Sequence, residues 1–158
     1  MWVKSAFVAL TLTAHTASAA EPESFGDWTA FCASDAGCAL ATVSADGHRL
    51  AFSEPNVGED RMVFLPVEPI QDGSVMTVTL DGQAGAQLGP GDGWRIVEMP
   101  GGAAAQIAPS IAENELMVRM PTRTMIEFNY VGKSGKRHIA ALSLKGYSTA
   151  RAYVTSRQ

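Results

Sequence analysis

Hydrophobic and polar residues alternate in short runs along most of this chain, and the runs are separated by turn residues. The run 126–130 is the clearest, because Ile126, Phe128 and Tyr130 are separated by polar residues. Alternation with a period of two predicts a strand with one buried face. Runs rich in β-forming residues lie at 28–31, 39–44, 49–53, 62–67, 75–80, 94–98, 125–131 and 137–144. Such a pattern indicates an all-β fold, an antiparallel β-sandwich of about 8–10 short strands with one or two short helices.

Two turn sequences predict tight hairpins. Asp46-Gly47 separates the runs 39–44 and 49–53, and Asp81-Gly82 follows the run 75–80. An Asp-Gly pair readily adopts the positive φ angles that a two-residue type I′ turn requires. We therefore expect a type I′ turn at both places.

Two segments have helical rather than alternating patterns. Ser110 followed by Glu113 has the spacing of a capping box and predicts a short helix that ends near Met117. In the last segment, from Tyr147 to about Thr155, apolar residues recur at helical spacing. The apolar stripe of this second helix is expected to pack on the sheet.

Residues 1–20 have the composition of a cleaved secretory signal peptide. Lys4 precedes a short apolar stretch, and Ala17-Ser18-Ala19 provides the small residues at which signal peptidase cuts. The stretch is shorter than the roughly 20 residues of a transmembrane helix, and no later stretch is long and apolar enough. We expect a periplasmic or secreted protein, with residues 21–158 as one domain without a transmembrane segment.

Charge is distributed unevenly along the chain. Residues 21–118 carry fifteen acidic and three basic side chains, whereas residues 119–158 carry eight basic side chains and one acidic. One interpretation is that acidic and basic strands are neighbours in the same sheet. The other is a basic surface for an anionic partner, either an envelope protein or an anionic glycolipid. The candidate residues for this surface are Arg123, Lys133, Lys136, Arg137 and Lys145. Nucleic acid is not expected as a partner of an exported chain with negative total charge.

The chain has two cysteines, Cys32 and Cys38. In an oxidising compartment they are expected to form one short-range disulfide. Redox catalysts usually place their cysteines as C-x-x-C at the start of a helix. The wider spacing between two predicted strands favours a structural bridge that pins the strands together.

Side chains with catalytic or metal-binding chemistry are few and scattered. His48 and His138 fall in different predicted strands, and neither has a cysteine or carboxylate at the spacing of a zinc site. Met117, Met120 and Met125 could supply soft copper ligands, but their apolar neighbours favour core packing. The chain also lacks a nucleophile elbow. We therefore expect a protein that is not an enzyme and has no cofactor or metal.

The two ends of the expected mature chain carry distinctive motifs. At the N-terminal end, Phe25-Gly26-Asp27-Trp28-Thr29 precedes Cys32 and Cys38. At the C-terminal end the chain reads Ser143-Leu144-Lys145-Gly146-Tyr147-Ser148-Thr149-Ala150. The first motif resembles the N-terminus of the invasion-associated locus B (IalB) family, and the second is similar to that family's ending of strand, glycine, aromatic residue and helix. The resemblance runs from about Phe25 to Val154. It marks Trp28, Cys32, Cys38, Gly146 and Tyr147 as structural positions.

The resemblance also has a departure. Members of the family often carry a second cysteine pair in the later half, where this chain has Met99 or a neighbour and Ala103. An ordinary apolar core is expected to hold that region instead. The resemblance implies a small exported all-β protein of a Gram-negative bacterium, of a family that has links to host-cell invasion and no agreed catalytic site.

Three functions are compatible with these observations. The first is an exported, non-enzymatic module that binds another envelope or host-surface component. The second is an enzyme or enzyme accessory that acts on an envelope substrate, for which a deep pocket with a buried carboxylate or His138 would be the mark. The third is a purely structural periplasmic protein, in which the uneven charge only serves internal pairing.

Overall fold

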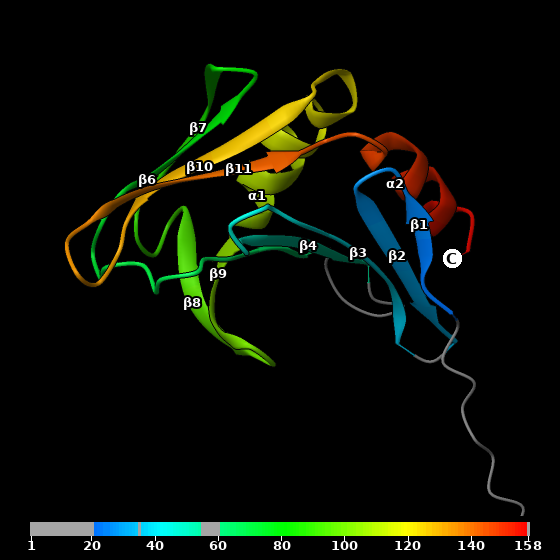
Figure 1. Ribbon diagram of the computed structural model, residues 1–158, viewed down its shortest axis with the longest axis horizontal. Coiled ribbons are helices and arrows are strands. Elements are labelled where there is room, and N and C mark those ends of the chain that lie inside the picture. Colours follow the sequence, from blue (N-terminus) through cyan, green and yellow to red (C-terminus); the bar gives the residue numbers. More distant parts are fainter. Residues whose placement is uncertain (1–20, 35, 55–60, 158) are drawn as a thin grey trace, which may run out of the picture.

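Two antiparallel sheets face each other and enclose the hydrophobic core (Figure 1). The computed structural model describes residues 21–34, 36–54 and 61–157. The expected signal peptide, residues 1–20, lies outside the described residues, so its cleavage and the single-domain prediction for 21–158 stay predictions. The predicted all-β sandwich is confirmed.

The larger sheet has seven strands in the order β1-β2-β3-β4-β5-β9-β8. Its first five strands follow one another as hairpins, and β9 and β8 are added at the far edge. Figure 1 shows this sheet as the lower layer, with β8 and β9 at one end and β2 and β3 at the other. The strands are β1 (Glu23–Phe25), β2 (Trp28–Ala33), β3 (Gly37–Val43), β4 (Arg49–Glu54), β5 (Arg61–Leu65), β8 (Trp94–Met99) and β9 (Gly102–Ile107).

The smaller sheet has four strands in the order β11-β10-β6-β7. They are β6 (Met76–Leu80), β7 (Gln83–Leu88), β10 (Met125–Val131) and β11 (Arg137–Ser143). As predicted, Ile126, Phe128 and Tyr130 of β10 are buried while their neighbours are only partly covered. Phe128 stacks on Phe64 of β5 with ring centroids 4.3 Å apart, which joins the two sheets. Burial of each such side chain contributes about 1.5–3 kcal/mol.

The turn predictions have different outcomes. At Asp81-Gly82 both residues have positive φ, 50° and 74°, so the type I′ turn is confirmed. At Asp46-Gly47 only Gly47 has positive φ, 95°, and the type I′ prediction is wrong. There the N–H of Ser44 donates to the carbonyl oxygen of His48, so the loop holds three residues and ends in a left-handed glycine.

The first predicted helix is present but begins differently. It consists of α1 (Pro109–Ile111) continued by a π-helical turn, η1 (Ala112–Met117), and a short 3-10 helix, η2 (Met120–Thr122), follows. The capping-box prediction is wrong, because the N-cap is Ala108 and no side chain caps the helix. Pro109 at the first helical position supplies the start, since its fixed φ suits a helix and its missing N–H needs no partner there.

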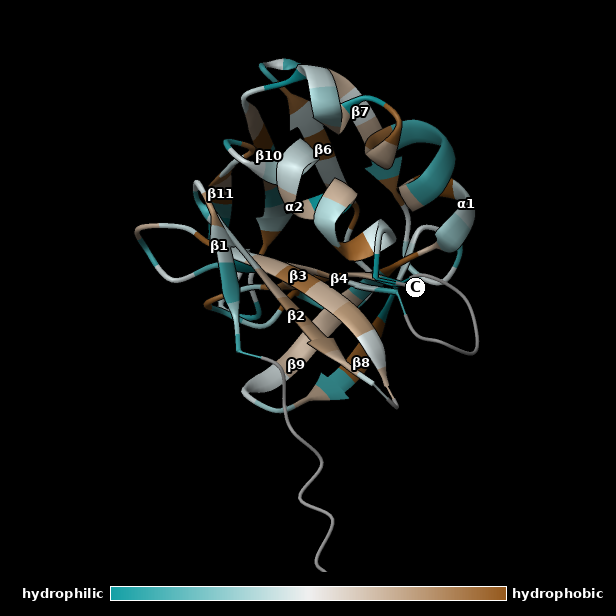
Figure 2. Ribbon diagram, turned by 90° about the vertical axis from the view of Figure 1, so that its right-hand side faces the viewer, coloured by the Kyte–Doolittle hydropathy of each residue, from teal (hydrophilic) through white to brown (hydrophobic). Residues whose placement is uncertain are grey.

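The last helix, α2 (Tyr147–Thr155), is where the sequence predicts it. Figure 2 shows it between the two sheets, at the side where the sandwich would otherwise be open. Its apolar stripe, Tyr147, Ala150 and Val154, is buried. Among the described helices, none is long and apolar enough to cross a membrane.

Candidate functional site

The two motifs at the ends of the chain meet in the structure. The indole Nε1 of Trp28 donates to the carbonyl oxygen of Ser143 at 3.0 Å, and the Ser143 hydroxyl donates to the Asp27 carboxylate at 2.7 Å. The backbone N–H of Asp27 donates to the carbonyl oxygen of Lys145 at 3.0 Å. The Trp28 and Tyr147 rings pack edge to face, with centroids 5.1 Å apart. These positions hold the first strands to the last helix, which is a structural role.

Two glycines make this junction possible. Gly146 has φ of 88°, and a Cβ there would collide with the carbonyl group of Phe25. A Cβ on Gly26, whose φ is 59°, would come within 2.7 Å of the carbonyl oxygen of Lys145. Any side chain at either position would push the two ends of the domain apart.

The disulfide between Cys32 and Cys38 is present and joins directly opposite residues of β2 and β3, with Cα atoms 4.1 Å apart. It lies in the strands and not at a helix start, the placement expected of a structural bridge. The region of the missing second pair, Met99 and Ala103, is the β8–β9 hairpin. That hairpin joins the sheet through the pairing of β9 with β5 and buries Ala105 against the core.

The five basic residues predicted to form one surface are divided into two groups. Lys133, Lys136 and Arg137 are exposed at the β10–β11 turn. Arg123 and Lys145 lie at the opposite end of the same two strands, where Met125 pairs with Ser143. The two strands are seven residues long, so roughly 20 Å separates the groups. We call the first group the basic turn.

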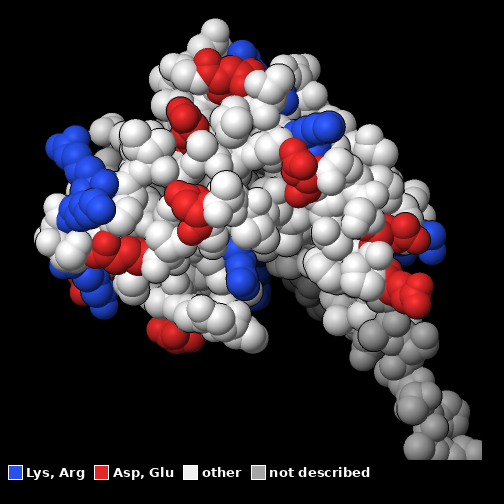
Figure 3. All heavy atoms as spheres, in the orientation of Figure 1, with Lys and Arg blue, Asp and Glu red and all other residues white. Residues whose placement is uncertain are grey.

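Figure 3 shows how these charges are presented. The end of the molecule that holds the β10–β11 turn in Figure 1 carries several basic side chains, with acidic ones directly beside them. Some basic groups therefore have acidic neighbours, and the basic turn faces solvent.

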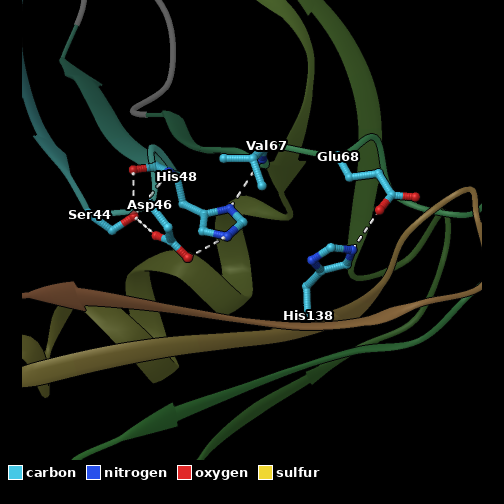
Figure 4. Close-up of polar contacts among 6 residues, drawn as sticks. All are labelled: Ser44, Asp46, His48, Val67, Glu68 and His138. Atoms are coloured by element: carbon cyan, nitrogen blue, oxygen red, sulfur yellow. Dashed lines mark hydrogen bonds and ion pairs between the residues drawn. The ribbon is translucent and has the colours of Figure 1, made fainter.

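Glu68, in the β5–β6 connection, anchors the basic turn. One carboxylate oxygen accepts the backbone N–H of Ser134 at 2.7 Å, and the other lies 2.6 Å from Nε2 of His138 (Figure 4). Hydrogen bonds from Ser134, reinforced by His138, lower the pKa of Glu68 to about 2. The carboxylate is therefore ionised at any physiological pH and holds the turn through charge-assisted hydrogen bonds.

Gly132 gives Glu68 the room it needs. A Cβ at Gly132 would collide with the Glu68 carboxyl group. Next to it, the backbone N–H of Lys133 donates to the carbonyl oxygen of Pro69 at 2.9 Å. The turn that carries the basic side chains is thus fixed at its backbone to the segment 68–70 and does not stand free.

A second histidine–carboxylate pair lies nearby, in the β3–β4 loop. Nε2 of the buried His48 is 3.3 Å from the Asp46 carboxylate, and its Nδ1 accepts the backbone N–H of Val67 at 3.2 Å (Figure 4). The Ser44 hydroxyl donates to Asp46 and accepts the backbone N–H of His48. A nucleophile relay needs serine bonded to the histidine ring. Here serine, aspartate and histidine instead close a turn.

Tyr130 lies between the two histidines. Its ring stacks on His138 with centroids 5.0 Å apart and meets the edge of His48 at 5.9 Å. Burial raises the pKa of the Tyr130 phenol and lowers the pKa of His48. Within the ranges 21–34, 36–54 and 61–157, no group of three or more metal-ligating side chains converges. The arrangement can fix the ends of the two sheets to each other.

Sequence reasoning missed Glu68 and its partners. The sequence marks His138 as a candidate side chain, but no local pattern links it to Glu68, 70 positions earlier. The division of the basic residues, in contrast, was visible in the sequence. Two strands joined by the turn at 133–135 necessarily place Arg123 and Lys145 together at the far end.

Comparison with known proteins gives a clear result only at the level of structure. No family model matches the chain, and no match is found among curated proteins. The solved structure of invasion associated protein B from Bartonella henselae superposes with a TM-score of 0.64 and 13% identity, over 88% of this chain and 99% of that one. The chain has the fold of invasion associated protein B. The resemblance seen in the two terminal motifs is thereby confirmed for the fold, and those motifs are the residues that close the invasion associated protein B-like sandwich.

Proposed function

We propose that this protein is an exported, non-enzymatic module that binds another envelope or host-surface component through the basic turn. The observation that carries the proposal is the anchoring of that turn. Lys133, Lys136 and Arg137 stand exposed on a backbone that Glu68 holds in place. A fixed cluster of like charges loses little conformational freedom on binding and steers an anionic partner toward it.

Three features support export to the periplasm or beyond. The disulfide needs an oxidising compartment to persist. The first twenty residues have the composition of a signal peptide. The fold is that of a Bartonella protein whose name associates it with invasion. The partner is expected to be an envelope protein or an anionic glycolipid and not a nucleic acid.

Affinity capture from an envelope extract tests this function. The bait is the purified protein with its disulfide formed, and retained material is identified at low and at moderate salt. Lys133→Glu, Lys136→Glu and Arg137→Glu together should abolish capture of the main partner, because like charges now face it. Arg123→Glu with Lys145→Glu is the matched control, since it reverses charge at the other end of the same strands.

The comparison between the two variants decides the outcome. A partner that is lost as salt rises, and lost in the first variant but kept in the second, supports the basic turn. Equal capture by the wild type and the triple variant refutes it. No retention under any salt condition contradicts the binding function and favours a purely structural role.

A further inference from the structure

An apolar cavity of about 110 Å³ lies beside the basic turn. Its floor is the face of the β8–β9 hairpin that carries Trp94, Ile96 and Ala103, and the segment 66–70 forms one wall. Ile96 at its rim is 45% exposed, which is unusual for an isoleucine that faces the inside of a sandwich. The lining residues used below are Trp94, Ile96, Glu98, Ala103 and Lys133.

The strand that borders this cavity is the last in its sheet. Among the strands that the structure describes, none pairs with the outer edge of β8. The carbonyl oxygen of Gly93 accepts an N–H from the β9 side, whereas the carbonyl oxygen of Trp94 accepts the N–H of Gly91 in the preceding turn. Successive residues of a strand direct their backbone groups to opposite sides. The N–H and C=O groups of Ile96 and Glu98 therefore point to the open edge.

The same two residues direct their side chains toward the cavity. A strand that paired with this edge would hydrogen-bond to Ile96 and Glu98, and its residue opposite Ile96 would have its side chain on the same face. That side chain would lie over the cavity. Recognition by strand addition has two elements. Backbone groups at the sheet edge bind the peptide main chain, and a pocket accepts one of its side chains.

The size of the cavity discriminates between two anionic partners. An engineered protein cavity of about 150 Å³ holds one benzene ring. A cavity of about 110 Å³ therefore accommodates one branched aliphatic side chain and is too small for the long acyl chain of a lipid. Lys133 lies at its rim, and Lys136 and Arg137 follow on the same turn. Glu98 also lines the cavity, so the two sides of the rim differ in charge. On the side of the basic turn, where Lys133, Lys136 and Arg137 are exposed, the complementary charge is an acidic side chain.

We propose that the outer edge of β8 takes up an extended segment of a partner protein as an additional strand. One aliphatic side chain of that segment fills the cavity beside Ile96, and an acidic side chain next to it pairs with Lys133. This proposal rests on the proposed function and identifies the partner class as a protein segment. The basic turn supplies the attraction, and the cavity and strand edge supply the selectivity.

Selection from a phage-displayed library of random peptides on the purified, disulfide-bonded protein tests the proposal. We expect enrichment of peptides in which an acidic residue lies one or two positions from a branched aliphatic residue. Binding of an enriched peptide is then measured by fluorescence anisotropy. Ala103→Leu, which fills the cavity, and Lys133→Glu, which reverses the charge at its rim, should each weaken binding at least about tenfold.

A single proline substitution tests whether the backbone of the outer β8 edge binds the peptide. Ile96→Pro removes an N–H that points away from β9, so the ladder to β9 stays complete. It should weaken peptide binding at least about tenfold, whereas Ile96→Val, which keeps the N–H, should change binding less than about threefold. Circular dichroism and urea unfolding report whether the proline variant folds. If the proline variant does not fold, the proposal is judged by whether Ala103→Leu binds the peptide more weakly than the wild type does.

Three results would overturn the proposal. One is a library selection without the aliphatic and acidic pattern. Another is peptide binding that neither Ala103→Leu nor a folded Ile96→Pro weakens. The last is concentration-dependent dimerisation that Ile96→Pro abolishes, because a second copy would then occupy the edge.

Vesicles of phosphatidylcholine and phosphatidylglycerol distinguish failure of the strand-addition proposal from failure of the proposed function. Binding to them that requires the basic turn, with no peptide selected, refutes strand addition and leaves the proposed function standing.

Discussion

Gly26 and Gly146 come from opposite ends of the domain and lie with their backbones in contact. A Cβ on Gly146 would be 3.0 Å from the nitrogen of Gly26, and a Cβ on Gly26 would be 3.3 Å from the Cα of Gly146. Trp28 and Tyr147 pack edge to face directly beyond them. The aromatic contact therefore depends on two positions that carry no side chain.

Gly146→Ala should lower the free energy of unfolding by about 3 kcal/mol, measured by urea denaturation. About 1–2 kcal/mol comes from the left-handed backbone, and the rest from the collision with Phe25. Gly135→Ala is the matched control, because Gly135 also has positive φ, 82°, but a Cβ there meets nothing within 4 Å. The free energy of unfolding of the control should fall only by the part that comes from the left-handed backbone. Equal losses in the two variants would show that the close approach of the two ends is unimportant.

Replacement of both Cys32 and Cys38 by serine should lower the free energy of unfolding by about 2 kcal/mol. The reason is that the bridge closes a short loop, with a sequence separation of 6, and so restricts the unfolded chain only modestly. Urea denaturation of the oxidised wild type and of the variant gives the difference. Partner capture by the folded variant should be unchanged. A variant of wild-type stability that captures nothing would instead indicate a redox role for the pair.

Glu68 should make stability depend on pH in the acid range. Its pKa is about 2 in the folded protein against an ordinary value of 4.5, so its contribution is complete above about pH 5 and is lost as pH falls toward 2. Glu68→Gln should flatten the dependence of the melting temperature on pH in this window. Asp72→Asn, which removes an exposed carboxylate from the same connection, is the control. A pH profile in which Glu68→Gln and Asp72→Asn match the wild type would contradict the anchoring role.

His48 should produce a separate loss of stability at higher pH than Glu68. Burial lowers its pKa below 6.5, and the Val67 N–H occupies Nδ1, so protonation requires that hydrogen bond to break. The stability that neutral His48 contributes is present above pH 6.5 and is lost as pH falls through its folded pKa. His48→Asn keeps an acceptor for Val67 and does not titrate, so its stability should vary less between pH 7 and pH 5. An NMR titration that finds His48 protonated above pH 6.5 would contradict this.

The core strands could be predicted because their own residues specify them. In β10, the alternation of Ile126, Phe128 and Tyr130 already fixes which face is buried. In β9, Ala103, Ala104 and Ala105 carry no strand preference, and the strand forms because Ala105 lies between Phe64 of β5 and Ile96 of β8. Its existence depends on neighbours that a local pattern does not contain.

The candidate site was predictable only in its charges. Lys133, Lys136 and Arg137 stand out in the sequence because acidic residues are almost absent after residue 118. The carboxylate of Glu68, in the β5–β6 connection, holds their turn in place. The same connection also forms one wall of the cavity beside them. Both depend on how the chain crosses from one sheet to the other, which no local spacing of residues reveals.

The meeting of the two terminal motifs also constrains when the protein can fold. The hydrogen bond from Trp28 to Ser143 spans 115 positions, so it cannot form until residue 143 has been synthesised. Contacts of such long sequence separation form slowly, because a long loop must close before they contribute. Until then β1 and β2 can pair with each other and with β3, but Trp28 lacks its contacts with Ser143 and Tyr147. Closure of the sandwich at this junction is thereby delayed until Tyr147 has been synthesised, which suits the export proposed above.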